Sequence, residues 1–565
     1  MSSLYPSFSH TSHRFLLTIW VSLFYSALLS LTFGQVNKLT STVDGITFDS
    51  DYDNGSLRAV FSPSTGNFNL SIYTEPGEIG SRKYWFRFTM DGVSGRSINL
   101  NIDHAENPRP FLRILDPTTS SWRRLNALEA PNSNSIVLNI VPGIQKIELA
   151  FFHPLGVEET FNEVSTMMRS SPYANSRILG TSTQGRNLPL VTVETPRYPN
   201  SGKHLVWIHS RAHAGEVTST HCLLGFLEQI LEDSPLGRQL REHCLFDVLP
   251  LLNVDGVHLG KTRWDSKGFD LESEWCGIRT PEVEAVKGHV DERMASSNPI
   301  TLALNLHSTR GNFSDTFFFK HLSPSISPAF EVIQQDYIDA FAAATPLFAN
   351  GAPQFSQLNA CTFIESYFWN NWGESVMALT HEGHFFRRIT DNEWITGPDY
   401  VALGRAQAAA LVTYFDLPAT SEPDLSYNDW QDQQFGPGEA AIAALKDDPD
   451  QDGINNLAEY AFALDPKQRD SSPLQIAPLA QTPGSSIALT FQTNQHTEDL
   501  QFFVEFSSNL TTWAREPLDG SSLNGVIKIV DTQRADGSYV DEYRVPLPES
   551  SRFARIVVES NSNPF

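Results

Sequence analysis

The chain has 565 residues, too many for one hydrophobic core, so several domains are expected. Apolar residues make up 40% of it and charged residues 19%, a balance typical of folded globular protein rather than of a disordered or fibrous chain. The formal net charge of −25 argues against nucleic acid as a partner, because phosphate binding requires clustered Lys and Arg.

The cysteines exclude two further classes of protein. Cys222, Cys244, Cys276 and Cys361 form no CxxC pair and no dense framework. Neither a thiolate zinc site nor a small disulfide-stapled fold is therefore indicated. One or two disulfides remain open at this point.

The N-terminus resembles an export signal. His13 and Arg14 precede an uncharged stretch at 15–33, and Thr32 and Gly34 are small residues at the positions that a signal peptidase reads. The stretch is also long enough to span a bilayer, so an uncleaved anchor is the alternative. We predict a signal peptide at 1–34, a secreted, periplasmic or cell-surface protein, and no membrane span beyond such an anchor.

The next region, 40–160, alternates short β-like runs with turn clusters, which predicts an N-terminal antiparallel β-domain of the sandwich type. The runs lie at 57–62, 68–74, 83–90, 97–102, 135–141 and 146–152.

Between 165 and 418 strand-like and helix-like segments alternate. The strand-like run 204–210 is followed by a helix-like run at 218–233 and a second strand-like run from 244, and the region closes with an Ala-rich helix at 401–415. This order is typical of an α/β domain with a parallel or mixed sheet.

The composition becomes polar and turn-rich at 419–470, which predicts a linker. Within it, Asp448, Asp450, Asp452 and Glu459 occupy positions 1, 3, 5 and 12 of a loop with Gly453 at position 6. Oxygen ligands at those positions favour Ca²⁺, and a polar acidic linker without an ion is the alternative. Strand-like runs between 471 and 565 predict a C-terminal antiparallel β-sandwich.

A His and a Glu follow the strand-like run 204–210 directly. His213 and Glu216 are three residues apart at the entry to the predicted helix, so both can reach one ion from a single turn. An isolated HxxE is weak, because helices carry that spacing by chance. The motifs that follow this HxxE along the chain, and their order, strengthen its interpretation as a metal site.

Those motifs are PLLNVDGVHLGKTRWDSKGFDL, TPEVEAV, ALNLHSTRGNF and VMALTHEGHFF. Their order and spacing resemble the M14 zinc carboxypeptidases, in which HxxE is followed by a P-x-x-N-P-D-G turn, D-L-N-R, a third His and a late catalytic Glu. ITFDSDYDNGSLRAV, KYWFRFTMDGV and IELAFFHPLGVEETFNEV resemble the N-terminal β-domain of the cytosolic-carboxypeptidase branch, the deglutamylase relatives. The resemblance implies a central carboxypeptidase-like α/β domain with a mixed sheet.

The resemblance also implies roles. His213, Glu216 and His307 match a zinc ligand set that leaves a fourth position for water. Glu382 matches the general base and Arg263 the residue that stabilises the oxyanion. Asp270 matches the aspartate of D-L-N-R, which would orient a zinc-bound His.

One departure affects substrate binding. Where the family has D-L-N-R, this chain has Asp270-Leu271-Glu272-Ser273, so the Asn-Arg pair that holds a terminal carboxylate is missing. We predict that Glu272 repels such a carboxylate. Arg279 and Arg310 are the arginines that can substitute, and Tyr367 is nearest to the family's mobile tyrosine.

These observations predict a secreted zinc metallocarboxypeptidase that uses a zinc-activated water and a Glu base on a peptide or amide bond near a C-terminus. Its partners would be peptide or protein C-termini or cell-wall peptides. The missing Asn-Arg pair leaves open a zinc amidase or deacylase acting on cell-wall peptides or N-acyl amino acids. A non-catalytic binding protein on the same scaffold is the third interpretation.

Overall fold

Over the residues it describes, the computed structural model forms two compact units, one up to Phe152 together with Asp255–Asp270, and the other His153–Val254 together with the chain from Leu271 onward. The described residues are 39–560 without 74–83, 104–108, 117–120, 170, 172, 196–197, 233, 274, 276–279, 310–314, 349–353, 357–362, 389, 421–429, 432–433, 437, 470–473, 480–485, 495–499, 519–526, 534–538 and 547–552. The predicted signal peptide lies outside them, and the predicted domain boundaries stay predictions.

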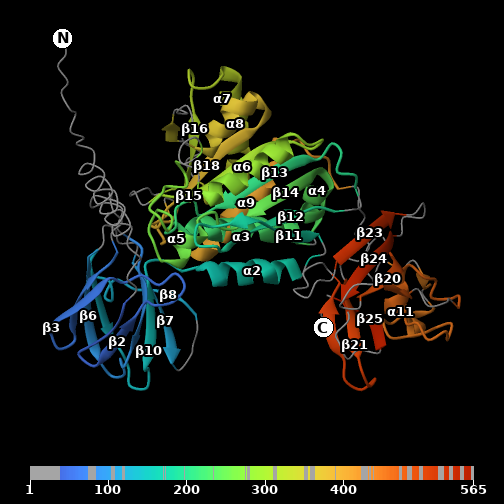
Figure 1. Cartoon of the computed structure of the whole chain (residues 1–565), viewed down its shortest axis with the longest axis horizontal. Helices are drawn as coiled ribbons and strands as arrows, with labels where there is room; N and C mark the ends of the chain where they lie inside the picture. The colour runs from blue at the N-terminus through green and yellow to red at the C-terminus, as the bar shows by residue number, and fades with distance from the viewer. Residues whose placement is uncertain are drawn as a thin grey trace, which may run out of the picture. The chain divides into compact units, whose positions relative to one another are not determined.

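The first unit is built of two β-sheets, drawn in blue in Figure 1. Its strands alternate buried and exposed side chains, as in β6, because successive residues of a strand point to opposite faces. One sheet has the order β1 (Thr40–Val43), β2 (Ile46–Asp49), β5 (Arg87–Asp91), β10 (Lys146–Ala150), β7 (Phe111–Asp116) and β8 (Arg123–Arg124). The other has the order β3 (Ala59–Ser64), β4 (Asn67–Ser71), β6 (Ser97–Asp103) and β9 (Ser135–Asn139).

The prediction of a purely antiparallel N-terminal domain is wrong at one strand pair. Strands β4 and β6 run parallel, with Phe68 opposite Leu100. The chain leaves β4 and passes through β5 of the other sheet before it returns as β6, and such a crossover allows a parallel pair. The rings of Phe48 and Phe68, which belong to different sheets, lie 5.1 Å apart in the core of this unit.

The second unit contains an eight-stranded mixed sheet, as the sequence predicted. Its order is β11 (Ala174–Thr181), β12 (Asn187–Val193), β14 (Cys244–Leu249), β13 (His204–Ser210), β15 (Ile300–Ser308), β18 (Met377–Gly383), β16 (Phe317–His321) and β17 (Gln354–Ser356). The four central strands β14, β13, β15 and β18 are parallel. They are almost continuously buried, as expected for strands covered on both faces.

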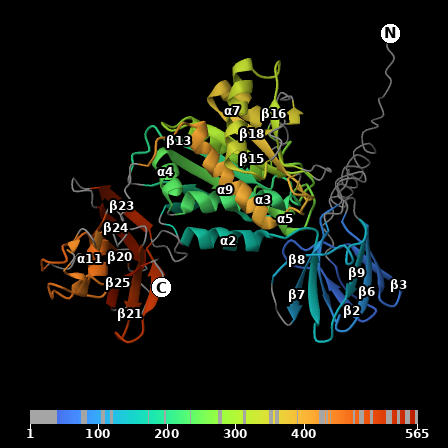
Figure 2. The same ribbon diagram turned by 180° about the vertical axis from the view of Figure 1, so that it is seen from behind.

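Helices cover both faces of this sheet. Figure 2 shows α3 (Val217–Leu231) and α9 (Gly397–Tyr414) in front of it, and Figure 1 shows α6 (Pro281–Met294) in front on the opposite face. Other helices that the structure describes include α2 (Val157–Arg169), α4 (Pro235–His243), α5 (Val254–His258), α7 (Pro328–Ala344) and α8 (Ile364–Trp372). Helix α9 begins at a capping box in which Thr396 and Asp399 each bond to the other's backbone N–H.

Helices α3 and α9 pack closely through glycines. A Cβ atom on Gly404 would lie 1.8 Å from the carbonyl oxygen of Cys222, and one on Gly225 would lie 2.0 Å from that of Val401. Because any side chain at these positions would clash with backbone atoms, only glycine permits this contact.

The C-terminal part has two antiparallel sheets. One has the order β19 (Leu474–Leu479), β20 (Ser486–Thr493), β24 (Tyr539–Pro546) and β23 (Ile527–Gln533), and the other the order β22 (Ala514–Pro517), β21 (Leu500–Ser507) and β25 (Phe553–Ser560). Helix α11 (Asn456–Phe462) precedes them.

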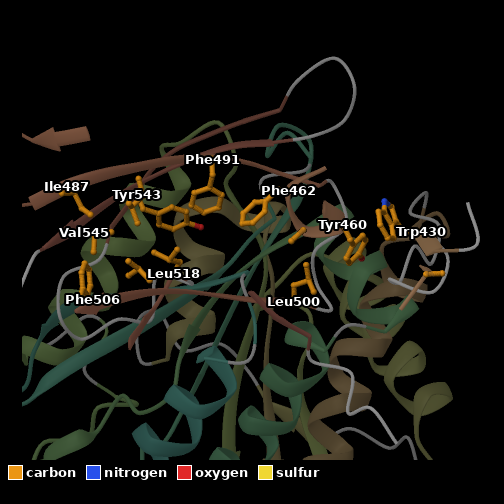
Figure 3. Packing of buried hydrophobic residues seen from close by; sticks show 14 of the residues in the cluster. Trp430, Tyr460, Phe462, Ile487, Phe491, Leu500, Phe506, Leu518, Tyr543 and Val545 are labelled. Carbon is orange, nitrogen blue, oxygen red and sulfur yellow. The ribbon is translucent and has the colours of Figure 1, made fainter. Parts of the chain in front are cut away.

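The segment predicted as a linker contributes to the core of this C-terminal part. Figure 3 shows Trp430, Tyr460 and Phe462 in one cluster with Phe491 and Tyr543 of the first sheet. The rings of Phe462 and Phe491 lie 5.8 Å apart. Because 419–470 is polar in composition, the sequence did not reveal these buried aromatic residues. They pack this segment against the sheets that follow.

Two predictions concern membranes and disulfides. None of the helices that the structure describes is both long and apolar enough to cross a bilayer. Cys222 and Cys244 are buried free thiols, and Cys276 and Cys361 lie outside the described residues.

Candidate metal centre

The candidate metal ligands lie at the carboxyl ends of parallel strands. The chain leaves β13 at Ser210 and reaches His213 and Glu216 just before α3 starts at Val217. His307 is the next-to-last residue of β15, the parallel neighbour of β13. Because parallel strands end at the same edge of a sheet, these three side chains meet there.

The three side chains are in direct contact. Nδ1 of His213 lies 2.7 Å from Oε1 of Glu216, and Nδ1 of His307 lies 2.8 Å from Oε2 of the same carboxylate. The two Nδ1 atoms are 3.1 Å apart. Each residue offers one ligand atom such that all three atoms lie within 4.8 Å of one another.

This arrangement fits a bound zinc ion. Two imidazole nitrogens and one carboxylate are the donors that catalytic zinc sites use, with a fourth position for water. His213, Glu216 and His307 are only 5%, 7% and 3% exposed, and buried polar groups require partners. The two Nδ1 atoms lie 3.1 Å apart, and a cation bound by both would give each nitrogen lone pair a partner.

The charges of the site favour a cation as well. Burial opposes the ionised Glu216 carboxylate, but His213 and His307 outweigh burial and hold the pKa of Glu216 well below 4.5. Burial also opposes a charged His307, yet Glu272 and Glu216 raise the pKa of its imidazole well above 6.5. The carboxylates around His307 therefore give this buried site a negative potential.

Glu382 lies opposite His307 on the next strand. In the parallel pair of β15 and β18, Glu382 is the partner of His307 and Gly383 is the partner of Ser308. Glu382 is partly exposed, but its Oε2 is shielded and accepts no hydrogen bond from the described part of the chain. Burial, with a contribution from Glu216, raises the pKa of Glu382 to about 8.

Glu272 has a position that the sequence did not indicate. Its Oε2 lies 3.0 Å from Nε2 of His307, on the ring edge opposite the candidate metal ligand atom. Glu272 is 5% exposed, and both of its oxygens also accept from Nδ2 of Asn305, at 3.0 and 3.1 Å. The expectation that Glu272 faces and repels a substrate carboxylate is therefore wrong, because its oxygens are already engaged with His307 and Asn305.

Asp270, predicted to orient a zinc-bound His, pairs with Arg263, and its orienting role stays a prediction. Oδ2 of Asp270 lies 2.7 Å from Nη2 of Arg263, and both side chains are partly exposed. The carboxylate beside a candidate ligand is that of Glu272, two residues further along the chain. One sequence signal indicated a carboxylate at this position, namely Glu272 where the family has Asn.

Of the remaining predicted substrate residues, the structure describes only Tyr367. The hydroxyl of Tyr367 donates to Oδ1 of Asp291 at 2.5 Å, and Nζ of Lys287 lies 4.5 Å from the centre of its ring. Arg279 and Arg310 lie outside the described residues.

A second polar row lies behind the candidate ligands. His209, Asn305 and Thr380 are partners across β13, β15 and β18, two residues before the level of His307 and Glu382. Nδ2 of Asn305 lies 3.2 Å from Oε1 of Glu365, which also accepts from the hydroxyl of Thr380 at 2.5 Å. Sequence reasoning missed Asn305 and Thr380, because only the alternation of β15 and β18 relates them to the ligands, and it missed Glu365, which comes from the separate helix α8.

The predicted calcium loop brings three of its four predicted acidic ligands together, without Glu459. Asp448, Asp450 and Asp452 each offer an oxygen within 4.8 Å of the others, and Glu459 is fully buried on α11. Backbone N–H groups of Asp452 and Gly453 donate to Asp448 at 3.2 and 3.0 Å. Gly453 has φ of 94°, the left-handed conformation that a tightly turned loop requires.

The class of protein follows from comparison with known families. Residues 166–314, which include His213, Glu216 and His307, match the family described as zinc carboxypeptidase, peptidase M14. The match covers the segment that carries the three candidate ligands and confirms the predicted resemblance to this family.

Two curated relatives support this. Mouse cytosolic carboxypeptidase 6 is 25% identical over 272 residues, which cover 43% of this chain and 50% of the mouse protein. Cytosolic carboxypeptidase 6 of Caenorhabditis elegans is 23% identical over 410 residues, covering 66% of this chain and 87% of that protein. The chain spans about half the length of the mouse and human relatives it matches.

Two solved structures share the fold. A metallo-carboxypeptidase from Burkholderia cenocepacia aligns with a TM-score of 0.55 at 22% identity, covering 66% of this chain and 99% of its own. One from Pseudomonas aeruginosa, solved in complex with (2-guanidinoethylmercapto)succinic acid, has a TM-score of 0.55 at 19% identity and covers 65% and 99%. The likeness establishes the fold alone.

The predicted location is contradicted. We expected a secreted, periplasmic or cell-surface protein, but the curated relatives from mouse, human and Caenorhabditis elegans are named cytosolic carboxypeptidases. The expectation rested on the uncharged stretch 15–33, on the basic residue before it and on the small residues at its end, a pattern that a signal peptide and a membrane anchor share. We do not retain secretion.

Proposed function

We propose that the chain is a zinc-dependent metallocarboxypeptidase that hydrolyses a peptide or amide bond near a C-terminus. The observation that carries this proposal is the convergence of His213, Glu216 and His307, with Glu382 directly opposite His307. When bound, zinc polarises the scissile carbonyl and acidifies water.

In this proposal, side chains of the protein carry out the remaining steps. His213, His307 and the Glu216 carboxylate would hold the ion. Oε2 of Glu382, which is shielded from solvent, takes a proton from water and delivers it to the leaving amine. The resemblance assigns stabilisation of the developing negative charge on the carbonyl oxygen to Arg263, whose guanidinium pairs with Asp270 within the first unit.

An amidase or deacylase that acts on N-acyl amino acids is the second function. The observation in its favour is the Glu272-Ser273 sequence, which supplies neither the Asn nor the Arg that holds a terminal carboxylate in the family that the chain resembles. Glu272 is engaged with His307 and Asn305, so it does not anchor the substrate instead.

Three substrates test the two functions: a peptide with a free C-terminus, the same peptide with a C-terminal amide, and an N-acyl amino acid. A carboxypeptidase releases single residues only from the free peptide, and an amidase or deacylase prefers the N-acyl substrate. Loss of activity with a chelator and its return with zinc is required of both. Binding without turnover by the wild-type protein, unchanged in Glu382→Gln, would leave the non-catalytic alternative.

Two finer predictions are kept as proposals for the flanking parts. A β-sandwich in each part is supported by the contact between Phe48 and Phe68 and by the shared C-terminal core. Calcium in the loop 448–459 is supported by the gathering of Asp448, Asp450 and Asp452.

A further inference from the structure

The Glu272 carboxylate contacts the edge of the His307 ring that faces away from the other candidate ligands. Nδ1 of His307 faces Glu216 and His213, and Nε2 lies 3.0 Å from Oε2 of Glu272. An imidazole that binds a metal through one nitrogen carries its proton on the other, and that N–H requires an acceptor when it is buried. His307 is 3% exposed, and Glu272 supplies this acceptor.

Glu272 is itself held in place by the row behind the ligands. Nδ2 of Asn305 donates to both of its oxygens, and the same group lies 3.2 Å from Oε1 of Glu365. Asn305 is two residues before His307 on β15, so both point to the same face of the sheet. Neither the ring nor its acceptor can rotate without breaking buried hydrogen bonds.

We propose that Glu272 is a positioning residue for the metal centre: it selects the His307 tautomer whose Nδ1 is free to bind the ion, and Asn305 fixes its orientation. The inference rests on the proposed zinc site. It assigns to the altered D-L-E-S segment a role in metal retention rather than in substrate recognition.

The experiment measures the zinc dissociation constant by competition with a chelating indicator. The variants are Glu272→Ala and Glu272→Gln, with Glu282→Gln as a matched control. Glu282 is a fully buried carboxylate of α6 that accepts from the backbone of Thr183 at 2.8 Å. His307→Ala reports loss of a ligand.

We expect Glu272→Ala to weaken zinc binding about 10- to 100-fold, the usual effect of removing such a partner. Glu272→Gln should lie between the wild type and Glu272→Ala, because a Gln amide can accept from His307 or Asn305 but presents an N–H₂ to the other. Glu282→Gln should bind zinc as the wild type does.

A second readout separates positioning from packing. In zinc-loaded protein labelled with ¹⁵N-histidine, the exchange-protected Nε2–H of His307 should be present in the wild type and absent in Glu272→Ala. Wild-type zinc affinity in Glu272→Ala, or an equal loss in Glu282→Gln, would overturn the inference and leave the zinc site standing. No zinc in the wild type, or unchanged zinc in His307→Ala, would instead refute the proposed function.

Discussion

His307 and Glu382 are partners in the parallel pair of β15 and β18, one on each strand and both at the carboxyl end. Neighbouring strands lie about 4.8 Å apart, so the sheet itself sets the distance between a candidate metal ligand and the candidate base. The chemistry of the site therefore depends on strand register.

The base is tested by Glu382→Gln. Gln has nearly the same shape but cannot take a proton, so we expect kcat to fall about 10²- to 10⁴-fold while zinc content stays equal to that of the wild type. Glu393→Gln, an exposed substitution, is the control and should leave kcat unchanged. Full activity in Glu382→Gln would refute the assignment of the base.

The ligands are tested by His307→Ala and His213→Ala. Each removes one of two imidazole donors, so we expect zinc, measured by elemental analysis, to fall from one ion per chain to well below that value. The wild type should lose activity with a chelator and regain it with zinc. His321→Ala, a buried histidine on β16, is the control and should retain the metal.

The buried carboxyl of Glu365 should make stability depend on pH. Burial, with a contribution from Glu272, raises its pKa from 4.5 to about 7. A folded-state pKa above the unfolded value means that the folded protein binds the proton more tightly, so this group's contribution to stability falls as pH rises from 4.5 to about 7. Glu365→Gln keeps the acceptor for Thr380 and Asn305 and carries no charge.

We therefore expect Glu365→Gln to match the wild type near pH 4.5 and to be more stable at pH 8, on the order of 2 kcal/mol. Urea unfolding at both pH values measures this difference. A variant less stable than the wild type at pH 8 would show that Glu365 is ionised at no cost in the folded protein.

A buried ion cluster should contribute to the stability of the sheet. Asp247 on β14 is fully buried and accepts from Nε2 of His289 at 2.7 Å and from Nε of Arg293 at 2.8 Å. Asp247→Ala leaves both partners without their carboxylate, which we expect to cost about 3 kcal/mol. Glu439→Gln breaks an exposed ion pair with Lys467 and should cost less than about 1 kcal/mol. Equal effects in the two variants would contradict this prediction.

Calcium is tested at the loop 448–459. If the loop binds the ion, millimolar Ca²⁺ should raise the melting temperature of the wild type, because a ligand that binds only the folded state stabilises it. Asp450→Asn should remove most of that increase, and Mg²⁺ should not replace Ca²⁺. An identical melting curve with and without Ca²⁺ would favour the polar acidic loop without an ion.

Local patterns predicted the elements well. Strand β13 lies at the predicted strand-like run 204–210, because this is a run of strand-forming residues bounded by polar segments. The helical pattern after His213 likewise corresponds to α3. The parallel pair β4 and β6 was not predicted, because nothing in either strand reports the direction of a partner that follows a crossover.

The candidate site could be predicted only where a motif names its residues. His213 and Glu216 share one turn, so their spacing carries the information. Glu272 and His307 are 35 residues apart, and their contact arises only when Leu271 is buried and β15 is placed in the sheet. The sequence analysis therefore identified Glu272 as unusual but assigned it a role in substrate recognition rather than a contact with His307.

The glycine contact between α3 and α9 bears on how the protein acquires its ion. Gly225 and Gly404 let the two backbones touch, so α3 is held by rigid main-chain packing rather than by adaptable side chains. Glu216 is the residue immediately before that helix, at its N-cap. We expect the metal-free protein to be already folded. The ion would then bind a preformed site, and its binding free energy would contribute to affinity rather than to folding of the chain.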